Sequence, residues 1–292
     1  MKLNTKTDHG WSKATLDEVL ELIRKAHGRD IHLFDENFLA NSLEKRLTAT
    51  STATLPAYAE RLGRDPAEAE AFYRSLRITY SEFFRNPLAF ALLEQPILPG
   101  IVEEKARNSR SELRVWSAGC ATGQEAWSVA ILLEELTTTR EHPVPFRIFA
   151  TDVSEANLTL AREGIYSAES VGNVRLRHLR EYFSRQGDFF AIAPRIRTRV
   201  DFSAHDLLDE CTTCPPASIY GHFDLVLCGN VLLYYRPETQ RLILNKLRRC
   251  LVTGGYLMTG ETERHIVENA GGFRAVAPPT SIFQRVRQKE GE

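Results

Sequence analysis

The segment Leu113–Leu133 constrains the fold of this chain more than any other part of the sequence. It opens with the short apolar run Leu113–Trp116, passes through Gly119 and Gly123 with only small residues between them, and continues with apolar residues at helical spacing. This order is typical of a β-strand, a glycine loop and a helix. In a parallel sheet, such a loop lies at the carboxyl edge of a strand, where the N-terminus of the next helix can bind a nucleotide-like ligand.

The spacing of the loop glycines narrows the class of ligand. The pattern G-x-x-x-G matches neither the dinucleotide fingerprint nor the phosphate loop of nucleotide triphosphatases. No lysine follows the second glycine, and Glu125 at the start of the helix would repel a pyrophosphate. A carboxylate beside small residues suits a ligand with a cationic amine, such as S-adenosylmethionine. A tight turn that binds no ligand is the alternative.

Composition excludes several classes of protein. A chain of 292 residues can hold one large or two modest domains. Its net charge of -1 excludes a generally basic nucleic-acid binder, so we expect no nucleic-acid partner. No apolar run approaches the roughly 20 residues of a membrane span, and the first residues lack the apolar core of a signal peptide. We therefore expect a cytoplasmic monomer without membrane insertion.

The cysteines do not form the pattern of a disulfide-stabilised protein. Their number is five, which is odd, and they are spread along the chain. Cys211 and Cys214 form a C-x-x-C pair with His205 and His222 nearby, so a zinc site is one alternative. The spacing of these four residues matches no zinc-binding pattern that we can justify physically. We therefore expect no metal there and interpret the two cysteines as ordinary thiols in a loop.

The N-terminal part of the chain, residues 1–85, is predicted to be a helical domain followed by a linker arm. Apolar residues recur at helical spacing in four segments, and proline or glycine separates several of them. A small helical bundle is the expected architecture. The arm contains Phe83, Phe84 and Arg85. An arginine beside two aromatic rings is held in a partly dry setting, which strengthens its hydrogen bonds to a carboxylate; the alternative is a connector whose rings fill a seam between domains.

Residues 86–292 are predicted to form a doubly wound, mostly parallel α/β sheet, because strand patterns alternate with helix patterns. We expect the second strand at Phe146–Asp152 and the third core strand at Phe223–Cys228. A small antiparallel β insertion is expected near residues 175–203. Its last strand would carry Ile196, Thr198 and Val200, which alternate with arginines.

Polar residues at the ends of these strands are candidates for the site. Asp152 ends the second strand, where an acid commonly accepts hydrogen bonds from ribose hydroxyls. Asn230 and Tyr234 follow the third core strand. Because the carboxyl ends of parallel strands open on one edge, we expect these residues near the glycine loop.

Several separated motifs occur together in one order. They are S-E-F-F-R after the helical segments, V-W-S-A-G-C-A-T-G-x-E, F-A-T-D-V, F-D-L-V-L-C-x-N-V-L-x-Y, and a G-G-Y-L strand. This combination resembles the CheR family of chemoreceptor glutamate methyltransferases over most of residues 10–286. The resemblance implies a methyltransferase fold, S-adenosylmethionine as cofactor, and the cytoplasmic domain of methyl-accepting chemotaxis receptors, or a related signalling protein, as partner.

The resemblance also implies roles for individual residues. Glu125 would bind the methionyl end of the cofactor, Asp152 the ribose, and Asp206 with Leu207 the adenine side. The catalytic residues would be Arg85 and Tyr234. The full set of cofactor-binding candidates is Thr79, Ser81, Arg85, Gly119, Glu125, Asp152, Asp206, Leu207, Asn230 and Val231. The β insertion matches the subdomain with which some members grip a receptor tail.

Two departures from the family pattern concern the grip on the substrate. The family commonly has C-R-N where this chain has Cys228, Gly229 and Asn230, and G-H-S-E where it has Gly260–Glu263.

The implied chemistry needs no histidine, because a glutamate with an ordinary pKa near 4.3 is ionised at neutral pH and can attack a sulfonium methyl without a general base. The alternatives are a methyltransferase of this fold that acts on another nucleophile, and a module that binds cofactor or receptor without turnover.

Overall fold

The computed structural model describes residues 11–286 except residues 12, 29, 78, 108–111, 139–142 and 219. The start of the chain, where we expected no signal peptide, lies outside this range. The chain divides into two compact units, Met1–Ile78 with Leu233–Gln240, and Thr79–Leu232 with Arg241–Glu292. Within the described residues, every helix is too short or too polar to cross a membrane.

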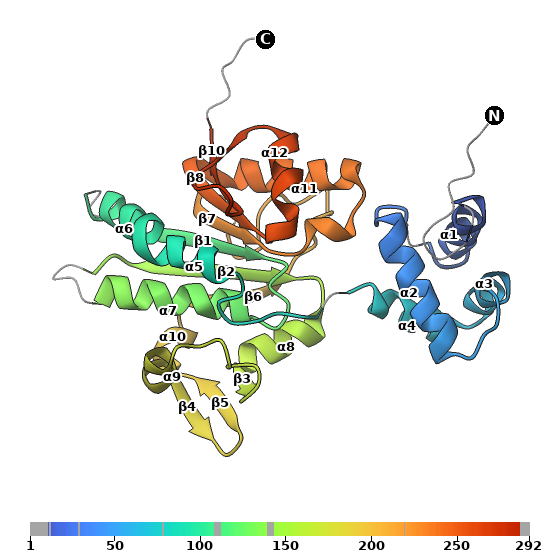
Figure 1. The fold of residues 1–292 in the computed structure, drawn as a ribbon, viewed down its shortest axis with the longest axis horizontal. Helices are drawn as coiled ribbons and strands as arrows, with labels where there is room; N and C mark the ends of the chain where they lie inside the picture. The colour runs from blue at the N-terminus through green and yellow to red at the C-terminus, as the bar shows by residue number, and fades with distance from the viewer. Residues whose placement is uncertain are drawn as a thin grey trace, which may run out of the picture. The chain divides into compact units, whose positions relative to one another are not determined.

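The first unit contains the predicted helices. They are α1 (Lys13–His27), α2 (Glu36–Ala49), α3 (Leu55–Arg64) and α4 (Pro66–Ser75) (Figure 1). The carboxylates of Asp35 and Asp65 accept hydrogen bonds from the first backbone N–H groups of α2 and α4, which fixes where these helices begin. The apolar faces of the helices meet in one core with fully buried Leu39, Leu43, Tyr58, Leu62 and Phe72.

A short segment from far along the chain is built into this helical unit. It comprises the end of the 3-10 helix Leu232–Tyr234 and the start of α11 (Pro237–Cys250). The backbone N–H of Asp35 donates to the carbonyl of Tyr234 over 2.8 Å. The rings of Phe34 and Tyr235 stack with centroids 5.0 Å apart.

The second unit is organised around a seven-stranded sheet in the order β6-β2-β1-β7-β8-β10-β9 (Figure 1). The neighbours from β6 to β8 pair in parallel, and β10 pairs antiparallel with both β8 and β9. This confirms the predicted mostly parallel α/β class. The strands are β1 (Leu113–Ala118), β2 (Phe146–Asp152), β6 (Val200–Ala204), β7 (Phe223–Cys228), β8 (Leu251–Thr259), β9 (Phe273–Ala275) and β10 (Ile282–Arg285).

The helices of the second unit precede, link or follow these strands. Apart from α11 and two helices near a smaller sheet, they are α5 (Pro87–Leu92), the π-helix Leu93–Ile97, α6 (Leu98–Arg107), α7 (Gln124–Thr138), α8 (Glu155–Glu163), the 3-10 helix Glu261–Glu263 and α12 (Arg264–Ala270). In α7, the residues Ala126 to Leu133 are all buried. The helix behind the glycine loop is therefore a core element, which fixes the position of its N-terminus.

A smaller antiparallel sheet in the order β3-β5-β4 belongs to the same unit. It is formed by β3 (Ile165–Ser167), β4 (Phe183–Gln186) and β5 (Phe189–Ile192), with α9 (Leu176–Tyr182) between β3 and β4. The antiparallel strand that we predicted through Ile196, Thr198 and Val200 is wrong. Pro194 is the first residue of a short helix, α10 (Pro194–Arg197), because its fixed φ suits a helix start.

Val200 instead opens β6, which pairs in parallel with β2 in the large sheet. Phe223–Cys228 is therefore the fourth strand of that sheet along the chain, not the third as predicted. From β1 the chain builds outward to β2 and β6, then returns to the other side of β1 to form β7 and β8. The direction of winding thus reverses between β1 and β7, and ligands of open α/β sheets bind at the carboxyl ends of such a strand pair.

Candidate functional site

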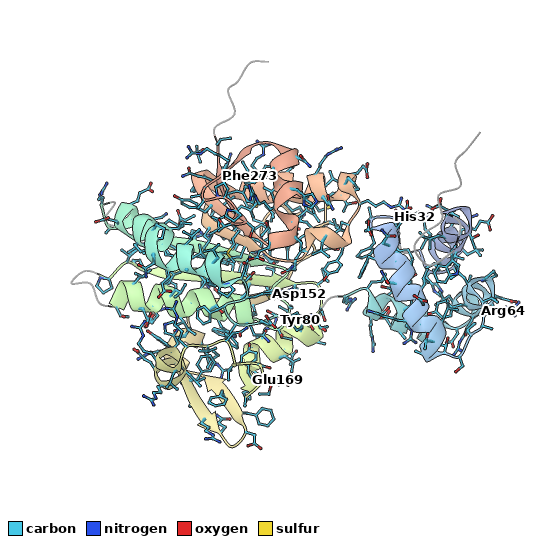
Figure 2. The ribbon with its side chains drawn as sticks, in the orientation of Figure 1. His32, Arg64, Tyr80, Asp152, Glu169 and Phe273 are labelled. Atoms are coloured by element: carbon cyan, nitrogen blue, oxygen red, sulfur yellow. The ribbon has the colours of Figure 1, made fainter. Side chains whose placement is uncertain are left out.

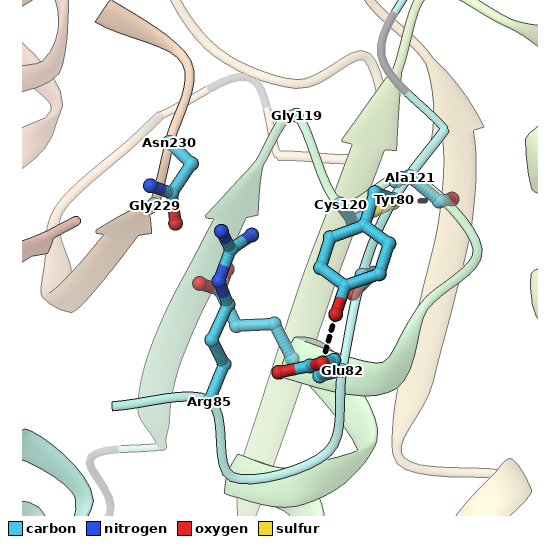
Figure 3. A pocket seen from close by; sticks show the side chains of 10 residues that line it. Tyr80, Glu82, Arg85, Gly119, Cys120, Ala121, Gly229 and Asn230 are labelled. Atoms are coloured by element: carbon cyan, nitrogen blue, oxygen red, sulfur yellow. Dashed lines mark hydrogen bonds between the residues drawn. The ribbon is translucent and has the colours of Figure 1, made fainter. Parts of the chain in front are cut away.

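A hollow lies where β1 and β7 end, and it encloses about 330 Å³ together with the adjoining open solvent. It is built from three segments of the second unit: the arm before α5, the glycine loop after β1, and the turn after β7 (Figure 3). The lining residues are Tyr80, Ser81, Glu82, Arg85, Gly119, Cys120, Ala121, Glu125, Gly229 and Asn230. The pocket therefore occupies the switch point that the strand order defines.

The glycine loop uses its backbone donors to hold itself against β2. The N–H groups of Gly119 and Cys120 both donate to the carbonyl of Thr151, over 2.8 and 2.9 Å. The N–H of Ala121 donates to Asp152 over 3.0 Å. Because these three N–H groups already donate to residues of β2, they do not form a phosphate cradle. The sequence argues against a pyrophosphate ligand on other grounds.

Gly119 also has to be a glycine in this arrangement. Its φ of 73° lies in the left-handed region, and a Cβ there would come within 2.7 Å of the Val231 Cγ2 atom. Val231 follows the turn after β7. The close approach of loop and turn at this point brings the ends of β1 and β7 together around the pocket.

Glu125 lines the pocket from the first turn of α7, two residues after Gly123. Its Oε1 accepts a hydrogen bond from the Ser117 hydroxyl over 2.8 Å. Removal from water, assisted by the charge of Glu263, raises the pKa of Glu125 to about 7, although the Ser117 hydrogen bond and the Arg85 charge act in the opposite direction. A cation bound beside this carboxylate would restore its charge, so the site fits the ammonium group of S-adenosylmethionine.

Gly229 leaves the space that the Glu125 carboxylate occupies. A Cβ at Gly229 would lie 2.8 Å from Glu125 Oε2. The next residue, Asn230, has a φ of 59°, and its N–H donates to Glu263 over 2.9 Å. The Gly260 N–H donates to the same carboxylate over 2.7 Å. The fully buried Glu263 therefore fixes the turn after β7 and places a negative charge behind Glu125.

The arm is anchored by its two phenylalanines. Phe83 is fully buried, and its ring meets those of Tyr166 and Phe183 edge-on at 4.9 and 5.4 Å. The N–H of Phe84 donates to the Ser128 hydroxyl of α7 over 3.0 Å. Both rings pack in the core of the second unit. This anchoring sets the position of Arg85, the next residue.

Arg85 is the cation of the pocket. Its guanidinium carbon lies 5.1 Å from the centroid of the Tyr80 ring, and the Tyr80 hydroxyl donates in turn to Glu82. Figure 3 shows the guanidinium directed into the pocket from the arm. The charge of Arg85 also lowers the pKa of Glu125 against the effect of burial.

Asp152 lies at the end of β2, beside the start of α8 (Figure 2). Its buried carboxylate accepts from the Ala121 N–H and, over 2.8 Å, from the Ser154 N–H. Asp152 thus ties the glycine loop to the next βα connection. Its role toward a ribose stays a prediction.

The structure brings together most of the residues predicted from sequence. Those that line the pocket are Ser81, Arg85, Gly119, Glu125 and Asn230, and both Asp152 and Val231 pack on the glycine loop. Thr79 and Asp206 are exposed, and Leu207 is buried in the loop after β6. Tyr234 belongs to the helical unit, where its ring packs against Phe38 at 4.8 Å. The roles proposed for these four residues stay predictions.

Sequence analysis missed Tyr80, Glu82, Cys120, Ala121 and Gly229 as lining residues, and Ser117 and Glu263 as supports. Two of these carry a recognisable pattern. Ser117 is a polar residue inside an otherwise apolar strand, and Glu263 is an acid after a glycine turn that follows another apolar strand. Buried polar groups of this kind need partners, which places them near other polar groups.

The residues around Cys211 and Cys214 form no ligand set. Among the described residues there is no group of three or more His, Cys, Asp or Glu side chains that could hold a metal ion. Cys211 is exposed, and the sulfur of Cys214 faces Cys250.

Comparison with known proteins identifies the family. Residues 79–281 match the family described as CheR methyltransferase, SAM binding domain. The chain belongs to this family. It is an S-adenosylmethionine-dependent methyltransferase, and S-adenosylmethionine is its cofactor.

Relatives extend the match beyond that domain. The chemotaxis protein methyltransferase of Escherichia coli is 30% identical over 258 residues, which are 86% of this chain and 85% of the relative. That of Listeria innocua is 30% identical over 83% of this chain and 87% of the relative. An uncharacterized 104.1 kDa protein of Rhodobacter capsulatus is 33% identical over 84% of this chain, and the matched region spans only 25% of the length of that relative.

Proposed function

We propose that this CheR-family enzyme transfers the methyl group of S-adenosylmethionine to glutamate side chains in the cytoplasmic domain of chemotaxis receptors. The products would be glutamate methyl esters, and the enzyme would act in the cytoplasm. One observation carries the proposal. At the switch point of the sheet, a partly buried carboxylate, Glu125, and a positioned cation, Arg85, face the same pocket from separate elements.

The two groups suit different parts of the reaction. Glu125 would hold the cofactor's ammonium, and Asp152 would accept hydrogen bonds from its ribose. The cofactor supplies an electrophilic methyl group on a positively charged sulfur. Arg85 would orient the incoming acceptor carboxylate by charge-assisted hydrogen bonds. Because Gly229 stands where the family commonly has arginine, Arg85 is the cation of the described pocket lining that can do so.

The composition of the pocket fits an acceptor that is already ionised. None of the ten described lining residues is a histidine. A glutamate carboxylate needs no proton removed at neutral pH, so positioning in line with the methyl group and exclusion of water supply most of the catalysis. Tyr234 would lie beside the transferred methyl; family resemblance alone supports this role.

The test is methyl transfer to a receptor fragment. The enzyme is incubated with methyl-labelled cofactor and cytoplasmic fragments of chemoreceptors from the source organism. We expect label in the fragment that is released by mild base, because carboxyl esters hydrolyse in base whereas N-methyl products do not. A fragment with its surface glutamates changed to glutamine is the matched control and should take up no label.

Two outcomes would contradict the proposal. Base-stable label would indicate a different nucleophile on the same fold. Tight cofactor binding without transfer to any receptor fragment would indicate a binding module without turnover.

A further inference from the structure

Cys214 and Cys250 are 36 positions apart in sequence, but their sulfur atoms lie 2.9 Å apart. Cys214 is in the loop between β6 and β7, and Cys250 is the last residue of α11. A disulfide bond of about 2.05 Å requires the sulfurs to move closer by only about 1 Å. From the sequence we interpreted Cys211 and Cys214 as ordinary loop thiols and did not anticipate that the sulfur of Cys214 lies beside that of Cys250.

The surroundings hold both sulfurs in place. Cys250 is buried, and its sulfur lies 3.2 Å from the carbonyl oxygen of Thr213 and 2.9 Å from the sulfur of Cys214. A Cβ at Gly221 would lie 2.8 Å from the Cys214 sulfur, so this glycine gives the thiol its space. Cys214 itself is partly exposed, which lets a small oxidant reach it.

Cys214 is also the more reactive member of the pair. Its hydrogen bond with Cys250, followed by the positive charges of Arg114 and Lys246, lowers the pKa of Cys214 although burial opposes this. The same contact and burial raise the pKa of Cys250. Burial raises the pKa of the thiols of Cys120 and Cys228 well above its usual value, which makes both poor nucleophiles.

We propose that Cys214 and Cys250 are a redox pair that hydrogen peroxide oxidises to a reversible disulfide. The Cys214 thiolate attacks one peroxide oxygen, the O–O bond breaks, and a sulfenic acid forms while hydroxide leaves and is protonated to water. Cys250 then loses its proton and attacks the Cys214 sulfur, the S–S bond forms, and the S–O bond breaks to release the second water. Two electrons pass from the sulfurs to the peroxide.

The disulfide would close a ring that contains β7, the turn with Gly229 and Asn230, and α11. Cross-linking a segment of this length restricts the unfolded chain. We expect the oxidised protein to melt roughly 5 °C or more above the reduced protein, and to return to the original melting temperature after reduction.

The experiment treats the full chain with hydrogen peroxide and maps its thiols by mass spectrometry. We expect two of the thiols to be lost. After digestion with trypsin, the peptide that begins at Cys250 should be cross-linked to the peptide that begins at Val200. Fragmentation of the linked pair is required to assign the partner, because no lysine or arginine separates Cys211, Cys214 and Cys228.

Variants make the assignment decisive. Cys211→Ser should form the cross-link and show the rise in melting temperature as the parent does, whereas Cys214→Ser should show neither. Cys250→Ala provides a second test from the other side of the pair. A Cys211–Cys214 disulfide, an unchanged cross-link in Cys214→Ser, or intact thiols after peroxide treatment in the parent would each overturn the proposal.

Discussion

Glu125 is a carboxyl group whose surroundings oppose its charge. Its pKa is about 7 in the folded protein, whereas an ordinary glutamate has a pKa of 4.5. Because the folded-state pKa is raised, the group's contribution to stability is complete below about pH 4.5 and is lost as pH rises through about 7. Glu125 therefore lowers the stability of the folded protein at neutral pH. Such a cost is expected at residues that a protein keeps for its function.

We therefore predict that Glu125→Gln stabilises the protein without cofactor at pH 8, by up to about 3 kcal/mol, because the variant stays neutral where the parent must ionise. At pH 4.5 the two proteins should melt together. Thermal unfolding at both pH values measures the difference. Equal melting temperatures at pH 8 would show that burial of the charge costs nothing.

The same residue predicts how cofactor binding depends on pH. Only the ionised carboxylate attracts an ammonium, so the affinity of the parent for the demethylated cofactor product should rise by roughly tenfold per pH unit up to about pH 7 and then level off. Glu125→Gln should bind more weakly and without this rise. Calorimetric titrations at several pH values test both statements, and parallel curves for the two proteins would assign the pH dependence to another group.

Asp152→Ala is predicted to weaken cofactor binding by about 1.5 to 3 kcal/mol, because a charge-assisted contact is lost and the Ala121 N–H loses its acceptor. Asp201→Ala is a suitable control, since this acid forms an exposed ion pair with Arg147. Unchanged affinity in a folded Asp152→Ala protein would remove the ribose assignment.

At the scale of elements, the arm offers a test of whether Arg85 acts more in methyl transfer than in cofactor binding. Its phenylalanines anchor it to the core, so Arg85 can be removed without releasing the segment. We predict that Arg85→Ala lowers the methylation rate by roughly ten- to a thousandfold while cofactor affinity changes less than tenfold, because misplacing a reacting group by about 1 Å costs on the order of a hundredfold. Tyr234→Phe should behave in the same way.

Melting temperature, cofactor affinity and initial rate are measured on the same preparations. Arg175→Ala is the matched control, because this arginine pairs with Glu94 at the surface of the same unit. A normal rate in either stable variant excludes that residue from the reaction centre. Joint loss of stability and cofactor binding would instead indicate a structural role.

At the scale of the whole molecule, each unit has its own stabilising interactions. In the helical unit, the buried Glu68 accepts hydrogen bonds from Arg46 at 2.7 Å and from Tyr58 at 2.6 Å. Burial alone would raise the pKa of Glu68, but these hydrogen bonds lower it overall. Its stabilising contribution is therefore present above the ordinary carboxyl pKa and is lost as pH falls through the lowered value.

We predict that Glu68→Gln destabilises the helical unit by about 2 to 4 kcal/mol at pH 7, because the Arg46 charge loses its partner, and by less in acid. Hydrogen exchange should show lower protection in α2 to α4 and unchanged protection in β1, β2 and β7. Glu60→Gln, which breaks only an exposed pair with Arg64, should change neither. Equal loss of protection in both units would show that they unfold as one.

The sequence by itself determined the features that depend on neighbouring residues. The strand, glycine loop and helix at Leu113–Leu133, the four N-terminal helices, and the strands ending at Asp152 and Cys228 all follow from local periodicity and turn residues. The shared edge of parallel strands then predicted that Asn230 and Tyr234 would lie near the glycine loop, and Asn230 does line the pocket beside Gly119. The order of the motifs indicated the family.

Tertiary structure decided which distant residues meet. Local alternation around Ile196 could not show that Val200 would find its partner in β2, because strand pairing depends on register with a segment far away in sequence. The raised pKa of Glu125 depends on burial and on Glu263, which is brought near by the turn after β7. The proximity of Cys214 and Cys250 has the same origin, because the two residues are 36 positions apart and only the folded chain brings their sulfurs within 2.9 Å.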